Sequence, residues 1–204
     1  RRPVEWLLEH AALDARWCLV HATHMTADET QRLARSGAVA GLCPITEANL
    51  GDGCFPGLDY ATHAGAFGIG SDSNVQIGPA AELRQLEYSQ RLQLRARNVL
   101  SVAHLHLGRA LFEAALHGGA RALDVPAGIQ LGAPADLVSL DLRAAAFASR
   151  ETDEVLDSWI FTAPERCIDA VWSAGVQVVQ SGRHRARDAI QARYRRVLEK
   201  LLRA

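Results

Sequence analysis

The sequence predicts an α/β fold built from parallel strand–helix units, followed by a smaller β-rich segment and a C-terminal helix. Two observations predict the parallel units: short apolar runs end in single polar residues, and helical patterns separate one run from the next. A third observation predicts the smaller segment, because from Pro126 onward short apolar runs follow one another with less helical pattern between them.

The first units alternate helix and strand. A helix is expected from Val4, after Pro3, and a strand over about 16–21. The Thr-Ala-Asp-Glu segment at 26–29 has the spacing of a capping box and predicts a helix to about residue 35. The next buried strand is expected over 38–43.

The following stretch brings the third strand of the series. Residues 44–56 are rich in Gly, Asn and Asp and are expected to form a loop. A short helix near 57–64 ends at Gly65, and the apolar run at 66–69 predicts the strand.

Helices and a hairpin are expected in the rest of the chain. The expected helices cover about 80–97 and 104–117, the second ended by Gly118-Gly119. A strand over 135–141 and a hairpin follow, and an amphipathic helix closes the chain. The hairpin strands are expected at 167–173 and 175–181, the last helix at 187–202, and the two domains at 1–125 and 126–204.

Composition excludes several classes of protein. The 204 residues are 49% hydrophobic, and 22 basic against 23 acidic side chains give a net charge of −1. This balance favours neither nucleic acid nor a membrane surface as a partner, and no apolar stretch approaches the roughly 20 residues of a membrane span. The four cysteines have no CxxC spacing and are expected to be reduced, mostly buried thiols of a cytoplasmic protein.

Two predicted strands deliver residues suited to hydrolytic chemistry. The apolar run at 17–20 leads to His21, and the run at 66–69 leads to Asp72. Catalytic groups of β/α barrels lie at the carboxyl ends of the strands, so we expect both side chains in one site. A carboxylate can ligate Zn²⁺ and accept a proton from an activated water, and a nearby imidazole can stabilise developing charge. The pattern alone leaves a structural role for His21 equally open.

Other polar residues are weaker candidates. His24 is expected to support the site or the fold, because on a strand it would face the opposite side from His21. Glu47 and Asn49 are candidates for substrate contact, although polar loop residues more often only solvate a turn. Cys43 and Cys54 are expected to be inert.

Several segments together are recognisable. These are 18–24, 36–44, the Thr-Glu-Ala-Asn-Leu-Gly-Asp-Gly run at 46–53, and 68–73, with 82–88 and 132–138. They resemble the formimidoylglutamate deiminases of the amidohydrolase superfamily, and the run at 46–53 is the most specific of them. The resemblance covers nearly the whole chain.

The resemblance implies the C-terminal part of a (β/α)₈ metal-dependent hydrolase barrel, strands 6 to 8, with a small β-domain. It also implies one Zn²⁺ and hydrolytic removal of ammonia from N-formimino-L-glutamate, which gives N-formyl-L-glutamate in histidine degradation. On the family pattern, His21 matches the sixth-strand histidine, which contacts the attacking water or substrate. Asp72 matches the eighth-strand aspartate, a zinc ligand that also shuttles a proton. The family's His-x-His, fifth-strand His and His-x-x-Glu would precede residue 1, and His104-Leu105-His106 comes too late in the chain to replace them.

Two other functions remain open. The chain could belong to another amidohydrolase deaminase, acting on a nucleobase or a triazine-like ring, although the 46–53 run argues against it. It could also be a non-catalytic fragment that completes a barrel only with a partner. We expect the isolated chain to be inactive and the full-length protein to form a homodimer.

Overall fold

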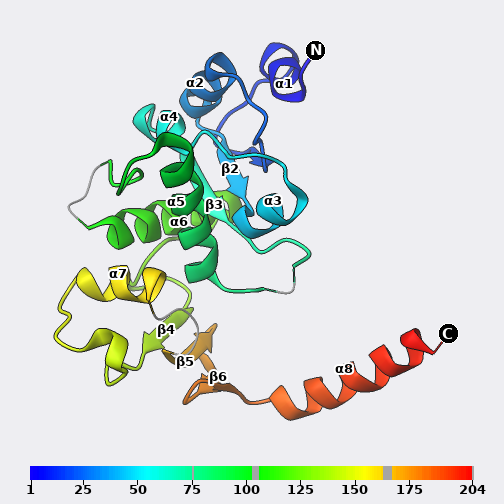
Figure 1. Cartoon of the computed structure of the whole chain (residues 1–204), viewed down its shortest axis with the longest axis vertical. Helices are drawn as coiled ribbons and strands as arrows, with labels where there is room; N and C mark the ends of the chain where they lie inside the picture. Colours follow the sequence, from blue (N-terminus) through cyan, green and yellow to red (C-terminus); the bar gives the residue numbers. More distant parts are fainter. Residues whose placement is uncertain (75, 103–105, 163–166, 204) are drawn as a thin grey trace.

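The computed structural model describes residues 1–74, 76–102, 106–162 and 167–203 (Figure 1). Within these residues the α-helices are α1 (Pro3–His10), α2 (Ala27–Ser36), α3 (Pro44–Leu50), α4 (Gly57–Thr62), α5 (Pro79–Leu94), α6 (Leu107–Leu123), α7 (Glu154–Phe161) and α8 (Arg187–Leu202). The strands are β1 (Cys18–Val20), β2 (Val39–Leu42), β3 (Ala66–Ile69), β4 (Leu137–Leu140), β5 (Ile168–Ser173), β6 (Val176–Gln180) and β7 (Arg183–His184), and η1 (Ala145–Phe147) is a 3₁₀ turn.

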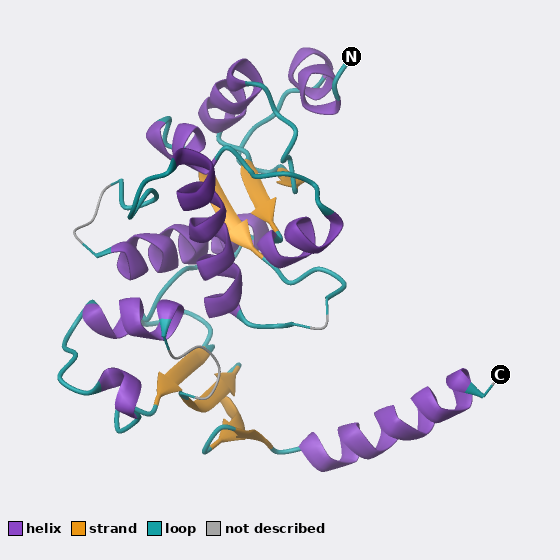
Figure 2. Ribbon diagram, viewed as in Figure 1, coloured by secondary structure: helices purple, strands orange, loops and turns teal. Residues whose placement is uncertain are grey.

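The first three strands form a parallel sheet in the order β1-β2-β3. Ala40 of β2 lies opposite Leu19 of β1 and Phe67 of β3, and all three side chains are buried. Helices flank this sheet on the upper part of the molecule in Figure 2. The expected parallel β/α units are therefore confirmed, and the carboxyl ends of the three strands share one edge of the sheet.

Helix α6 packs directly on β3, and the reason is a pair of glycines. A Cβ atom at Gly118 would clash with the backbone of Phe67, and one at Gly68 would lie 3.0 Å from the backbone of Gly119. The helix continues to Leu123, so the expected stop at Gly118-Gly119 is wrong. Gly118 and Gly68 permit the close approach of helix and strand, and Gly118-Gly119 does not end the helix.

Helix α3 occupies residues expected to form a loop. Pro44 stands at its first position, where its lack of an N–H costs nothing, and Gly51 ends it in the left-handed conformation. The N–H of Ile45 donates to Oε2 of Glu82, 2.9 Å away on α5. This buried carboxylate, distant in the sequence, satisfies the start of a helix that local pattern did not predict.

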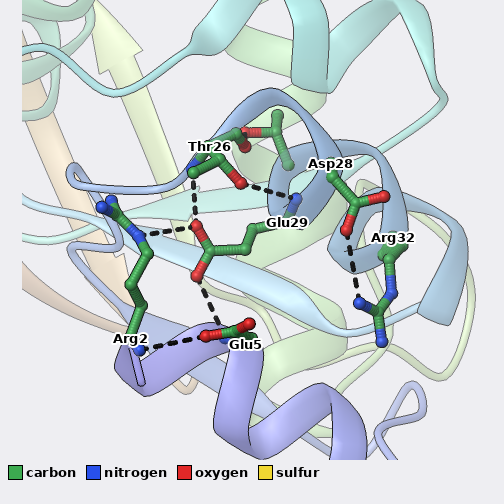
Figure 3. Close-up of polar contacts among 7 residues, drawn as sticks. Arg2, Glu5, Thr26, Asp28, Glu29 and Arg32 are labelled. Atoms are coloured by element: carbon green, nitrogen blue, oxygen red, sulfur yellow. Dashed lines mark hydrogen bonds and ion pairs between the residues drawn. The ribbon is translucent and has the colours of Figure 1, made fainter.

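Glu29 joins the first two helices, as Figure 3 shows. One of its carboxylate oxygens accepts the N–H of Glu5 at 3.0 Å, and the other accepts Nε of Arg2 at 3.0 Å and the N–H of Thr26 at 2.6 Å. Thr26 in turn accepts the N–H of Glu29, which completes the expected capping box of α2. The side chain that caps α2 therefore also anchors α1.

The second half contains an antiparallel sheet in the order β4-β5-β6-β7. The expected hairpin is confirmed, since β5 pairs with β6 through a turn at Ala174-Gly175. Helix α7 was not expected. Its residues Trp159 and Ile160 are buried in the same apolar cluster as Leu111 of α6, so the core continues past residue 125. The division into domains at this residue stays a prediction.

Helix α8 extends away from the rest of the chain (Figures 1 and 2). It has the expected bounds, and none of its residues is buried. Its apolar face, which includes Ile190, Tyr194 and Leu201, is exposed. No helix in the described part of the chain is long and apolar enough to cross a membrane.

Candidate active site

His21 and Asp72 follow the carboxyl ends of β1 and β3. The N–H of His21 donates to the carbonyl of Gly41 at 2.8 Å, and the N–H of Gly70 donates to the carbonyl of Leu42 at 2.9 Å, so strand pairing continues up to the site. Beyond these bonds the chain turns sharply. His21 has φ +66° and Asp72 has φ +52°, left-handed conformations that are costly for side chains other than glycine. Such strain is often found at functional sites.

The two predicted residues are brought together. Nε2 of His21 lies 3.8 Å from Oδ2 of Asp72, which is too long for a direct hydrogen bond but allows both atoms to reach one small group. Both side chains are part-exposed, at 35% and 39%. The other oxygen of Asp72 accepts the N–H of Ser73 at 2.6 Å. Oδ2 is thus the oxygen that faces the imidazole.

Glu47 is a third member of this cluster. Its Oε1 lies 3.3 Å from Nδ1 of His21 and accepts the N–H of Cys43 at 2.9 Å. Burial raises the pKa of Glu47, while the hydrogen bonds from Cys43 and His21 act in the opposite direction. The sequence predicts a loop here and makes Glu47 only a candidate for substrate contact. Helix α3, which no local pattern predicts, places it beside His21.

The remaining candidates lie elsewhere or are open to solvent. His24 and Asn49 are exposed, and His24 follows a left-handed turn at His21 and Ala22 rather than the alternation of a strand. His106 pairs with Asp157 at 2.9 Å. His104 falls outside the described residues.

The cysteines are free thiols, but only two of the four are buried. Cys18 and Cys54 are exposed, so the expectation of mostly buried thiols is only half right. Burial, followed by the nearby charges of Glu47 and Asp72, raises the pKa of Cys43 to about 11. A thiol with so high a pKa is a poor nucleophile at neutral pH.

A cavity of about 760 Å³ opens beside β1 and includes His21. Its lining also includes Val4, Leu7, Trp17, Val20 and His24. Strand β1 pairs only with β2 in the described part of the chain, so the cavity follows an unpaired sheet edge. An apolar hollow along such an edge is suited to receive further protein structure.

The described residues do not by themselves form a complete metal site. Among them, no group of three or more His, Cys, Asp and Glu side chains is placed to hold a metal ion. Protein zinc sites need three or four protein ligands, and the expected ligand here is Asp72 alone. As the described side chains are placed, Asp72 therefore does not by itself make a zinc site.

Comparison with known proteins identifies close relatives. Residues 1–178 match the amidohydrolase family. The chain is 48% identical over 204 residues to formimidoylglutamate deiminase of Pseudomonas aeruginosa, and the match covers 99% of this chain and 45% of that protein. It is 33% identical over 147 residues to 5-methylthioadenosine/S-adenosylhomocysteine deaminase of Halobacterium salinarum, and this match covers 70% of this chain and 33% of that protein. The expected resemblance to formimidoylglutamate deiminases is confirmed, and the chain matches less than half the length of each of these curated relatives, 45% and 33%.

Solved structures agree with this likeness. An amidohydrolase from Brucella melitensis superposes with a TM-score of 0.93 at 52% identity, over 99% of this chain and 45% of that one. An adenosine deaminase from Xanthomonas campestris with bound zinc superposes with a TM-score of 0.86 at 24% identity, over 100% of this chain and 46% of that one. The second likeness concerns the fold alone.

Proposed function

This chain belongs to the amidohydrolase family, and we propose that it forms part of an enzyme that hydrolyses N-formimino-L-glutamate to N-formyl-L-glutamate and ammonia in histidine degradation. The observation that carries the proposal is the facing pair of His21 Nε2 and Asp72 Oδ2 at 3.8 Å, in a chain similar over nearly its whole length to a formimidoylglutamate deiminase. The complete enzyme is this chain together with the remaining half of the family's fold. Within that fold we propose that β1, β2 and β3 are barrel strands 6, 7 and 8.

Asp72 and His21 would have different roles in one addition–elimination reaction. A water oxygen attacks the formimino carbon, Asp72 accepts the proton that the water loses, and the carbon–nitrogen double bond becomes a single bond. His21, on the other side, orients the attacking water through Nε2, which accepts a hydrogen bond from it. Asp72 passes this proton to the terminal nitrogen, and then accepts the proton of the newly added hydroxyl group and delivers it to the same nitrogen. The bond between this nitrogen and carbon breaks, and ammonia leaves as the hydroxyl oxygen becomes the carbonyl oxygen of the formyl group.

We further propose one Zn²⁺ per complete site, with Asp72 as the ligand that this chain contributes. When bound, such an ion supplies Lewis-acid activation of water. The exposed carboxylate at a strand end, directed at His21, is consistent with this role. The missing ligands would come from the part of the fold that the relatives have in addition.

The test is release of ammonia by the complete enzyme from N-formimino-L-glutamate, compared with adenosine, cytosine, guanine and the aminotriazine melamine. We expect turnover of N-formimino-L-glutamate alone. Turnover of a nucleobase or nucleoside instead would favour the purine-deaminase relatives, and no turnover of any substrate would favour the non-catalytic alternative.

A further inference from the structure

The position of Glu47 points to a role beyond capping a helix. Glu47 is 4% exposed, and its Oε1 is shared between the N–H of Cys43 at 2.9 Å and Nδ1 of His21 at 3.3 Å. We infer that Glu47 is a positioning residue: it holds the Nδ1–H of His21 and thereby presents Nε2 toward Asp72. The inference rests on the proposed function, in which Nε2 faces the reacting group.

Glu47 lies in a first helical turn that is held firmly in place. The hydroxyl of Thr46 donates to the carbonyl of Ser71 at 3.1 Å, and Nδ2 of Asn74 donates to the Thr46 oxygen at 3.1 Å. On the other side, Ile45 donates its N–H to Glu82. The first turn of α3 is thus fixed to the loop after β3 and to α5, so the imidazole must adjust to Glu47 rather than the reverse.

The hydrogen bond to Glu47 decides which ring nitrogen of His21 carries the proton. Oε1 of Glu47 already accepts the N–H of Cys43, so it acts as an acceptor toward the ring as well. A neutral imidazole that donates from Nδ1 has its lone pair on Nε2, and this is the nitrogen that lies 3.8 Å from Asp72. Carboxylates that hold the remote nitrogen of a functional histidine fix both its tautomer and its orientation.

Glu82 shows how a positioning role of Glu47 differs from simple support of the helix. Glu82 is also buried and also accepts an N–H from the first turn of α3, but its partner is Ile45 and not the imidazole. If Glu47 only supported α3, loss of either carboxylate would have similar consequences. A positioning role predicts that only Glu47 affects the state of His21.

The experiment uses the complete enzyme labelled with ¹⁵N-histidine, in wild-type form and as Glu47→Leu, Glu47→Gln and Glu82→Gln. Imidazole ¹⁵N shifts report the tautomer, and comparison with a His21→Gln variant identifies the His21 signals. We expect the Nδ1–H tautomer in the wild type, a mixture in Glu47→Leu, and no change in Glu82→Gln. Glu47→Gln keeps a carbonyl oxygen near Nδ1 and should retain the wild-type tautomer.

Kinetics provide the second readout. Glu47→Leu should lower kcat by on the order of 10- to 100-fold, with KM changed by less than about threefold, and Glu47→Gln should recover part of the loss. A loss confined to KM would overturn the inference, because it would make Glu47 a substrate contact. If Glu47→Leu does not fold, the wild-type spectrum still decides, since an Nε2–H tautomer excludes the inferred hydrogen bond.

The tautomer measurement tests the positioning role, and the ammonia assay tests the proposed function, so either proposal can be excluded without the other. Absence of turnover with N-formimino-L-glutamate would remove the proposed function while leaving the His21–Glu47 bond measurable. A wrong tautomer in an active enzyme would remove only the positioning role.

Discussion

Nε2 of His21 and Oδ2 of Asp72 lie 3.8 Å apart, although the strands that they follow, β1 and β3, are separated in the sheet by β2. The segment after β2 provides Glu47, which contacts the other nitrogen of the same imidazole. Each of the three parallel strands therefore leads to one member of a line of polar groups, carboxylate–imidazole–carboxylate, at one edge of the sheet. This arrangement explains why the activity of the complete enzyme should depend on single atoms of these side chains.

Asp72→Asn in the complete enzyme is expected to abolish turnover while leaving the fold nearly intact. The change is almost isosteric, but it removes the proton acceptor opposite His21 and weakens any metal ligation. His21→Ala should lower kcat by on the order of 10² to 10⁴. The measurement is steady-state ammonia release, with His63→Ala and Asp59→Asn as controls, because Asp59 of α4 and His63 directly after α4 form a similar His–Asp pair at 3.1 Å. Turnover at the wild-type rate in either site variant would exclude that residue from the chemistry.

The positions of His21 and Asp72 could be predicted from the sequence because a buried parallel strand leaves a local signature. Each residue ends an apolar run too short for a helix, and parallel strands place such ends together. The contact of Glu47 with His21 could not be predicted in this way. It depends on α3, whose start is satisfied by Glu82 on a different helix, and a local pattern of Pro, Asn and Gly does not contain that information.

Gly118-Gly119 illustrates the same limit in the core. Two consecutive glycines in a helical pattern usually indicate the end of the helix, and the sequence predicts an end here for that reason. Here the lack of a side chain at Gly118 lets α6 approach β3 closely, a requirement set by tertiary packing. The segment at 154–161 was missed for a related reason, since α7 is short and its burial comes from contact with α6 and α5.

This packing predicts opposite effects for two neighbouring substitutions. Gly118→Ala should destabilise the complete enzyme by about 1–3 kcal/mol, because the methyl group would meet the backbone of Phe67 on the strand that leads to Asp72. Gly119→Ala has open space around it and should be neutral or stabilise by up to about 1 kcal/mol through helix propensity. Urea unfolding of both variants measures the difference. Equal effects of the two substitutions would contradict the close contact.

Zinc binding should distinguish the isolated chain from the complete enzyme. The isolated 204-residue chain is expected to bind Zn²⁺ weakly, because Asp72 is the only ligand that it is expected to contribute and three or four are needed. Metal analysis after dialysis against a mild chelator should find zinc in the complete enzyme and little in the chain. Near-stoichiometric zinc in the isolated chain would show that other residues, such as His21 or His24, complete a site.

The unpaired edge of β1 predicts self-association of the isolated chain. Trp17 and Val20 are 39% and 58% exposed along this edge, which is a template for pairing with another strand. Light scattering after size-exclusion chromatography should show mass increasing with concentration. Val20→Lys should reduce the association because lysine on an edge strand opposes pairing. Val176→Lys is the control, since Val176 is 50% exposed but lies in the other sheet, on β6, where it is paired with Ser173 of β5. A stable monomer would exclude an open barrel segment.

The contributions of the two buried carboxylates Glu29 and Glu82 to the free energy of unfolding should change with pH in opposite directions. Burial alone would raise the pKa of Glu29, but hydrogen bonds from Thr26 and Glu5 and the charge of Arg2 hold it below 4.5. Burial raises the pKa of Glu82 above 4.5, the nearby charge of Glu47 adds to this, and Oε1 of Glu82 has no hydrogen-bond partner in the described residues.

The sign follows from proton linkage. A lowered pKa in the folded state contributes stability above 4.5 that is lost as the pH falls through the folded pKa, so Glu29→Gln should cost more at pH 7 than at pH 4. A raised pKa means that the folded state binds the proton more tightly, so the wild type loses stability as the pH rises from 4.5 through the folded pKa of Glu82. Glu82→Gln does not have this loss and should therefore become more favourable relative to the wild type at pH 7 than at pH 4. Urea unfolding of the complete enzyme at both pH values measures the two differences, and the same sign for both variants would contradict the opposed environments of these carboxylates.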